Sequence, residues 1–149
     1  RSLTTLKESG GSPYDGVILE YVNPFKQGPV LPTMSCLIQL LRPEEHTRAH
    51  RHTSSAIYFG VKGSGQSVID GERFDWGKGD FFLTPPWAWH EHANPTNDES
   101  ILFVISDKPI LDAFGYYREE AYLENGYRQA VTKVFTPEHS RALDKERAS

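Results

Sequence analysis

The chain has 149 residues, of which 38% are hydrophobic and 24% charged, as in a globular protein with one buried core. Its formal net charge of −4 argues against non-specific nucleic-acid binding, and its single cysteine, Cys36, excludes an intrachain disulfide and a cysteine-based zinc site. No apolar run approaches the roughly 18 residues that span a bilayer, and no signal peptide is evident, so we expect a cytoplasmic protein that does not engage membranes.

Residues 1–16 are polar and rich in glycine and serine, which predicts a linker or an N-terminal arm. From Val17 onward, short runs of β-branched and aromatic residues are separated by turn signals about every eight to twelve residues. Asp70-Gly71 between two of these runs predicts a two-residue hairpin loop. We expect strands over residues 17–22, 33–41, 46–52, 55–61, 65–70, 72–76, 80–85, 90–94 and 100–106. Residues 17–106 are therefore expected to form an all-β sandwich or barrel.

We expect residues 107–149 to form a C-terminal helical extension that packs on this barrel. Asp107, followed by KPILDAF and Gly115, predicts a short capped helix. Thr136-Pro137-Glu138 supplies a cap residue, a proline at the first helical position and an acid in the first turn, which predicts the start of a terminal helix.

Four of the six histidines form two H-x-H pairs, His50 with His52 and His90 with His92. Residues two apart on a strand point to the same face, so each pair directs two imidazoles to one side. The separation of about forty residues suits two strands that meet in one small β-domain. The pattern predicts a shared metal ion.

The residues around both pairs resemble the two motifs of the cupin superfamily. Gly79, Pro85, His90 and Asn94 follow the second motif, G-x5-P-x-G-x2-H-x3-N, with Trp87 in place of its middle glycine. HRHTSSAIYFGVKGSG, which begins at His50, resembles the first motif, H-x-H-x3,4-E-x6-G. The resemblance implies a cupin jelly-roll β-barrel with short C-terminal helices.

By the same resemblance, His50, His52 and His90 are the metal ligands. The usual cupin glutamate falls at Ala56 or Ile57, so three neutral imidazoles remain, and two positive charges on a divalent ion stay uncompensated. Such a site suits an anionic chelating substrate and leaves coordination positions open. Fe(II) is the expected ion, with Zn, Ni or Mn as alternatives.

Other residues are assigned by face and by neighbourhood. His92 shares a face with His90 and is expected to carry protons beside the centre as the catalytic histidine. Gln39 and Tyr58 are expected to line the substrate pocket with polar ends. Trp76 and Phe81 are expected to lie in the core.

The stretches YVNPFKQGPVLPTMSCLIQLL, HRHTSSAIYFGVKGSGQSVIDGERFDWGKGDFFLTPPWAWHEHAN and LFVISDKPILDAFGYYREE resemble the gentisate 1,2-dioxygenase family, which includes salicylate dioxygenases. This resemblance covers nearly everything from Asp15 to Glu120. It implies an extradiol-type aromatic ring-cleaving dioxygenase that uses Fe(II) and O2 on an ortho-hydroxybenzoate. It also implies a homo-oligomer, or the other half of a two-cupin protein as partner.

Two departures from the family pattern leave alternatives open. Tyr58 stands where the iron-bearing N-terminal cupin of the family usually has an arginine for the substrate carboxylate, and Ser35 stands where a tryptophan is usual. The chain most resembles the C-terminal cupin of the family. It is therefore a dioxygenase, a non-catalytic or structural cupin half, or a metal-binding cupin with another task, such as an isomerase or a small-ligand sensor.

Overall fold

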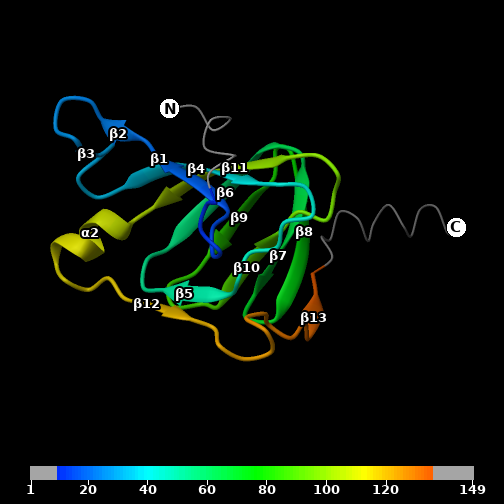
Figure 1. The fold of residues 1–149 in the computed structure, drawn as a ribbon. Helices are drawn as coiled ribbons and strands as arrows, with labels where there is room; N and C mark the ends of the chain where they lie inside the picture. The colour runs from blue at the N-terminus through cyan, green and yellow to red at the C-terminus, as the bar shows by residue number, and fades with distance from the viewer. Residues whose placement is uncertain (1–9, 136–149) are drawn as a thin grey trace, which may run out of the picture.

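The computed structural model describes residues 10–135, and in that range almost all of the regular structure is β. A five-stranded sheet has the order β1-β4-β11-β6-β9, and a six-stranded sheet has the order β12-β5-β10-β7-β8-β13 (Figure 1). The first comprises β1 (Val17–Glu20), β4 (Ser35–Leu41), β11 (Ser100–Ser106), β6 (Ala56–Lys62) and β9 (Phe81–Thr84). The second comprises β12 (Glu119–Ala121), β5 (His50–His52), β10 (His90–Ala93), β7 (Ser64–Ile69), β8 (Glu72–Gly77) and β13 (Lys133–Val134).

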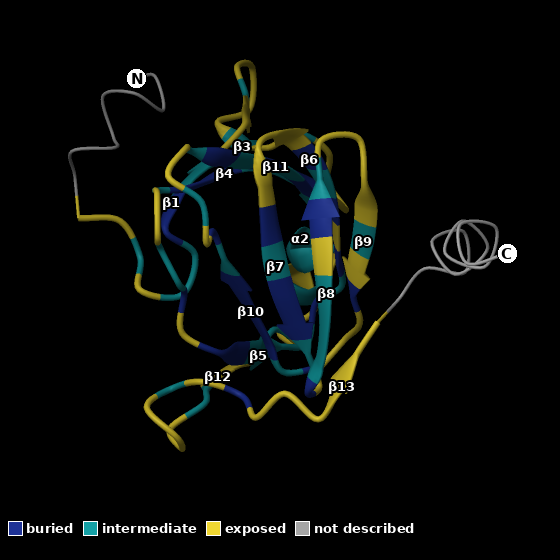
Figure 2. Cartoon of the chain, turned by 90° about the vertical axis from the view of Figure 1, so that its right-hand side faces the viewer, coloured by how far each residue is buried: buried dark blue, intermediate teal, exposed yellow. Residues whose placement is uncertain are grey.

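The two sheets enclose one core, as expected for a jelly-roll barrel. Leu41, Leu102 and Val104 from the first sheet pack in the same buried cluster as Trp76 from the second. In Figure 2 the inner strands β7 and β10 are largely buried, whereas the outer strand β9 is exposed along much of its length. The predicted all-β class is confirmed.

Each of the nine predicted runs overlaps at least one described strand. The Asp70-Gly71 hairpin is confirmed, because Ile69 pairs with Glu72 and both loop residues have positive φ, 46° and 79°. Mirror-image turns of this kind require positive φ at both central positions. The run predicted over residues 46–52 is regular strand only over β5, and His46 forms just an isolated bridge with Ala93.

The segment after residue 106 differs from the expected helical extension. Helix α2 (Lys108–Ala113) confirms the short helix, with Asp107 as its cap residue. The rest of the described segment instead adds β12 to β5 and β13 to β8, because open strand edges offer unpaired backbone groups to a neighbouring chain segment. The terminal helix predicted from Thr136 lies outside the described residues.

The two aromatic core predictions have different outcomes. Trp76 is buried, and its indole N–H donates to Ser67 Oγ at 3.0 Å. The prediction for Phe81 is wrong, because its side chain is 71% exposed on the outer strand β9. An edge strand has no neighbour on one side, and the Phe81 ring packs against that of Phe59 across the ladder.

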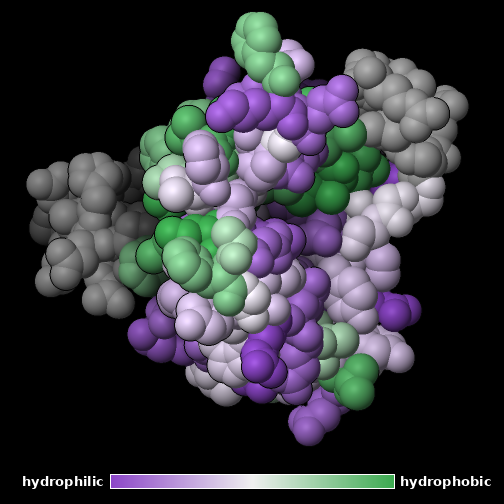
Figure 3. All heavy atoms as spheres, turned by 90° about the vertical axis from the view of Figure 1, so that its left-hand side faces the viewer, coloured by the Kyte–Doolittle hydropathy of each residue, from purple (hydrophilic) through white to green (hydrophobic). Residues whose placement is uncertain are grey.

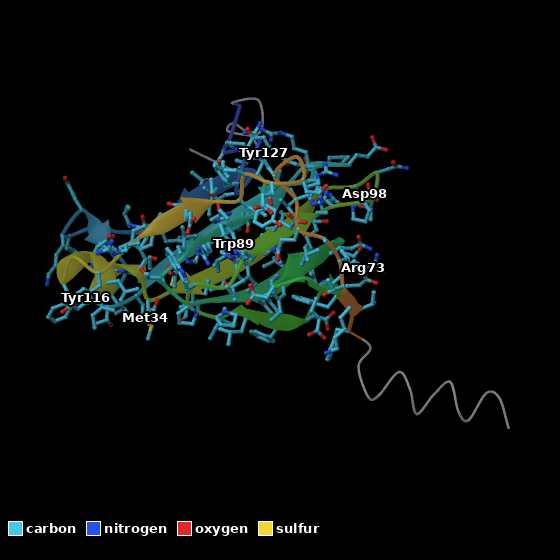
Figure 4. The ribbon with its side chains drawn as sticks, turned by 90° about the horizontal axis from the view of Figure 1, so that it is seen from below. Met34, Arg73, Trp89, Asp98, Tyr116 and Tyr127 are labelled. Carbon is cyan, nitrogen blue, oxygen red and sulfur yellow. The ribbon has the colours of Figure 1, made fainter. Side chains whose placement is uncertain are left out.

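The short elements gather at one end of the barrel. The hairpin of β2 (Val22–Asn23) and β3 (Gly28–Pro29) lies beside α2 in Figure 1. Seen from below, Met34 and Tyr116 lie at this end, whereas Asp98 lies toward the opposite end (Figure 4). Two of the metal-ligand candidates, His50 and His52, line a cavity that α2 and its neighbours also line.

Candidate metal centre

Strands β5 and β10 bring three histidines together. The two strands are antiparallel neighbours, and His50 pairs directly with His90. The ring centroid of His90 lies 4.3 Å from that of His50 and 4.7 Å from that of His52. One ligand nitrogen from each of the three lies within 4.8 Å of the other two. The period-two pattern of each strand thus assembles the three residues that the cupin motifs single out.

Backbone carbonyls fix which nitrogen of each ring is free. His52 Nδ1 lies 2.8 Å from the carbonyl oxygen of Ser54, and His90 Nδ1 lies 3.0 Å from that of Ala88. A carbonyl only accepts, so each Nδ1 carries the proton and each Nε2 keeps its lone pair. His50 Nδ1 lies 3.5 Å from the carbonyl oxygen of Arg48 in the same arrangement. The three rings are therefore oriented as metal-ligating histidines usually are.

Burial favours the neutral form of the His52 and His90 imidazoles. It lowers the pKa of His90 well below its ordinary value, and the nearby His50, His92 and His52 add to the effect. Burial and His50 also lower the pKa of His52, although its bond to Ser54 partly opposes this. His90 Nε2 is buried and has no hydrogen-bond partner among the described residues. A buried lone pair without a partner, beside two more, fits a divalent metal ion.

His92 lies in the same layer but has different partners. Its Nδ1 lies 2.8 Å from Ser67 Oγ, which already accepts the indole N–H of Trp76. Among the described residues, His92 Nδ1 is the one acceptor bonded to the Ser67 hydroxyl, so we assign the Ser67 hydrogen to this bond and the ring proton to Nε2. Burial lowers the pKa of His92 to about 3, and its ring packs 4.8 Å from that of Tyr58. His92 is therefore a neutral hydrogen-bond donor next to His90. It is absent from the lining of the cavity beside the triad.

A cavity of about 750 Å³ opens beside the three histidines at the α2 end of the barrel, the end that faces the viewer in Figure 3. His50, His52 and Tyr58 line it, as does Tyr117. Tyr58 thus lies where a pocket residue was predicted, whereas Gln39 lies outside the lining. The buried Gln39 amide instead donates from Nε2 to the backbone carbonyl of Asp15 at 2.8 Å.

The cavity contains charges that the strand pattern could not reveal. Lys108 is the one basic residue of its described lining, and its Nζ lies 4.2 Å above the ring centre of Tyr117. That ring stacks on His52 with 6.3 Å between centroids. The acidic residues of the described lining are Asp15, Glu20, Asp112 and Glu119. Lys108 lies in the short helix α2 and Tyr117 in the loop after it. Neither segment has a periodic pattern from which the site could be predicted.

Comparison with known proteins finds a family model and several relatives that are similar to this chain. The family model "Cupin domain" matches residues 37–106. The 5-aminosalicylate 1,2-dioxygenase of Comamonas sp is 50% identical over 125 residues, which are 84% of this chain and 33% of that protein. A gentisate 1,2-dioxygenase of Haloferax sp is 38% identical over 108 residues, 72% of this chain and 29% of that protein.

Solved structures agree with this relationship. A salicylate 1,2-dioxygenase from Pseudaminobacter salicylatoxidans superposes with a TM-score of 0.69 at 28% identity, over 79% of this chain and 34% of that one. The chain spans about a third of the length of the relatives that it matches. Within the described residues, no helix is long and apolar enough to cross a membrane. Residues 37–106 of the chain thus match a cupin domain, and the chain is similar to parts of the gentisate and salicylate 1,2-dioxygenases.

Proposed function

We propose that this chain forms the Fe(II)-binding cupin of a dioxygenase that cleaves the ring of an ortho-hydroxybenzoate with O2. The observation that carries the proposal is the triad of His50, His52 and His90, whose Nε2 lone pairs converge beside a cavity of about 750 Å³. A cavity of that size accommodates a single aromatic ring with its substituents. The relatives named above act on salicylate-type and gentisate-type acids, which supports this substrate class.

The roles of the side chains follow from where they lie. The three histidines hold the ion and leave its cavity side open. Bound Fe(II) supplies open coordination positions and redox chemistry for an anionic chelating substrate and O2. Tyr58 and Tyr117 present aromatic walls to the substrate ring, and burial raises the pKa of both phenols, which keeps them neutral hydrogen-bond donors. Lys108, whose Nζ pairs with Asp112 in this structure, supplies the positive charge nearest to a substrate carboxylate in the cavity.

We propose modified roles for His92 and Gln39, which the sequence predicted to be a catalytic and a pocket-lining residue. His92 does not line the cavity. We therefore propose that it acts indirectly, through its ring contacts with Tyr58 and with the ligand His90. Gln39 is proposed to shape the site by holding the Asp15 loop rather than by touching substrate. Both roles depend on buried hydrogen bonds, which fix geometry more firmly than exposed ones.

The proposal is tested by loading the purified chain with Fe(II) under anaerobic conditions and then adding O2 and a hydroxybenzoate. Gentisate, salicylate and 5-aminosalicylate are the substrates to compare. We expect O2 consumption, loss of the aromatic absorption and a ring-opened acid, all abolished in His52→Ala. The control His46→Gln removes an imidazole outside the triad, which pairs with Glu91 instead. Iron binding without O2 uptake on any of these acids would contradict the proposal.

One observation favours a second candidate, a supporting cupin half without turnover. The buried Tyr58 occupies the position where the catalytic cupin of the resembling family usually has an arginine. A supporting half would still bind metal. It would consume O2 only after addition of a complementary cupin, which the same assay detects.

A further inference from the structure

Arg51 lies between the two metal-ligand candidates of β5 and points to the opposite side of the strand, because successive side chains on a strand alternate. Its guanidinium carbon lies 4.4 Å from the ring centre of Trp87 and 4.3 Å from that of Trp89. These two tryptophans belong to the segment that leads into β10, and Trp89 directly precedes the third candidate, His90. One arginine thus connects the two parts of the chain that carry the ligands.

The same guanidinium also binds the neighbouring strand β12. Arg51 Nε and Nη2 donate to Glu120 Oε2 at 2.9 and 2.6 Å, and the two residues are direct partners in the pairing of β5 with β12. The Glu120 side chain is 49% exposed, so an isolated ion pair of this kind would contribute little. Arg51 instead combines the ion pair with two cation–π contacts, so three segments of the chain meet at one planar group.

This connection matters because the backbone pairing between the ligand strands is short. Within the described residues, β5 and β10 pair only at His50 and His90. His52 lies beyond that pair, and its carbonyl oxygen accepts the backbone N–H of Trp87 at 2.8 Å. The position of His52 relative to His90 therefore depends on the contacts between residues 87–89 and β5, to which Arg51 contributes its side chain.

The backbone of Trp87 is a second, independent indication. Its φ is 63°, in the left-handed region that favours glycine, and the cupin motif has a glycine at this position. A tryptophan with this backbone is strained, and such residues persist where the surrounding contacts hold them. The stack of its ring on Arg51 is an interaction that glycine could not make.

We propose that Arg51 is a positioning residue of the metal centre. By stacking between the two indoles, it holds His52 and His90 at the spacing that one ion requires. Arg51 is not part of the described cavity lining, so its effect passes through the backbone of β5 and of the segment before β10. The inference rests on the proposed metal centre and deepens it.

Metal binding without turnover tests this role. The dissociation constant for Co(II) is measured by calorimetry on the metal-free chain, and the visible spectrum of bound Co(II) reports the geometry of its ligands. We expect Arg51→Met to weaken binding about tenfold, the lower end of the range for groups that orient metal ligands, and to alter the spectrum. Glu120→Gln should give a smaller loss. The double variant should bind no more weakly than Arg51→Met alone, because both changes act through Arg51.

Two controls separate positioning from charge and from stability. Arg118→Met removes the same charge from an exposed side chain, and Arg118 contacts Thr53 through its backbone. Gly60→Ala should destabilise the fold through a clash in β6, away from the triad. Thermal unfolding of each variant sets a temperature at which all are folded, and there both controls should bind Co(II) like the wild type.

Wild-type affinity and spectrum in Arg51→Met would overturn the role of Arg51 and leave the histidine centre standing. The same loss of affinity in Arg118→Met or in Gly60→Ala would also overturn it. Failure of the wild-type chain to bind Co(II) would overturn the centre itself.

Discussion

The side chains of His90 and His92 point to the same side of strand β10, yet the Nδ1 of His90 donates a hydrogen bond and the Nδ1 of His92 accepts one. His90 Nδ1 faces the carbonyl oxygen of Ala88, whereas His92 Nδ1 faces the hydroxyl of Ser67. The two rings lie 5.9 Å apart, and both Nε2 atoms are buried without a partner among the described residues. One Nε2 thus offers a lone pair and the other a proton, which separates a metal ligand from a hydrogen-bond donor.

This difference predicts opposite tautomers in the metal-free chain. Long-range proton–nitrogen spectra of ¹⁵N-histidine-labelled protein at neutral pH should show His90 protonated at Nδ1 and His92 at Nε2. Ser67→Ala removes the hydroxyl that donates to His92, so it should shift the tautomer of His92 and leave His90 unchanged. The same tautomer at both rings would contradict the hydrogen-bond assignment.

Removal of one ligand should abolish tight metal binding. His52→Ala is expected to weaken Fe(II) or Co(II) binding more than about 100-fold, beyond the effect of partners outside the ligand sphere. His46→Gln should bind metal like the wild type, because its imidazole pairs with Glu91 on another side of β10. Metal titration followed by calorimetry measures both. Equal affinities in the two variants would exclude the triad as the binding site.

Acid should destabilise the metal-free fold through its buried histidines. An unfolded histidine titrates near 6.5, whereas burial lowers the pKa of His92 to about 3 in the folded chain. Between these values the unfolded state binds more protons, so stability is fully present above about pH 6.5 and falls as the pH drops toward 3. Each such group contributes up to about 1.4 kcal/mol per pH unit.

Urea unfolding at a series of pH values measures this slope. His92→Gln removes one of the titrating groups, so its free energy of unfolding should depend less steeply on pH than that of the wild type. A slope that stays the same in the variant would show that His92 titrates normally in the folded chain.

The charges of the cavity should set its affinity for anionic substrates. Lys108→Met should weaken salicylate binding to the Zn(II)-loaded chain, and Glu20→Gln should strengthen it, since both residues line the cavity. Each effect should stay below about tenfold, because exposed charges contribute about 1 kcal/mol or less. Both effects should shrink at high salt. Changes of the same sign in the two variants would contradict the electrostatic account.

Strand β6 should tolerate no side chain at Gly60. A Cβ there would lie 2.1 Å from the carbonyl oxygen of Gly77, and neither backbone can move freely within a sheet. Gly60→Ala should therefore cost at least about 1–3 kcal/mol of unfolding free energy, the range for overpacked sites. Gly28→Ala is the control, because its Cβ would meet only one atom at 4.0 Å. Denaturant unfolding compares the two, and equal stabilities would refute the clash.

The two histidine pairs were predictable from local periodicity, whereas the choice of His90 over His92 as a ligand came from the cupin resemblance. His50 and His52 alternate around Arg51 on one strand, and the second pair does the same, so spacing alone places the imidazoles on common faces. The Asp70-Gly71 hairpin was predictable for a similar reason, since two residues determine the turn.

The parts that the sequence did not reveal depend on long-range packing. Asp15 belongs to a turn 35 residues before His50, and nothing in its flanking residues indicates that its carboxylate lies 3.9 Å from His50 Nε2. Lys108 reaches the site from a six-residue helix. The edge position of β9, which exposes Phe81, follows from the order of strands in the sheet, which no single segment specifies.

The most direct test of this account is a crystal structure of the metal-loaded chain with anomalous diffraction at the absorption edge of the ion. The account predicts one ion bound by the Nε2 atoms of His50, His52 and His90, at about 2.0–2.2 Å from each. An ion held through His92, or no ion at the triad under saturating metal, would contradict it.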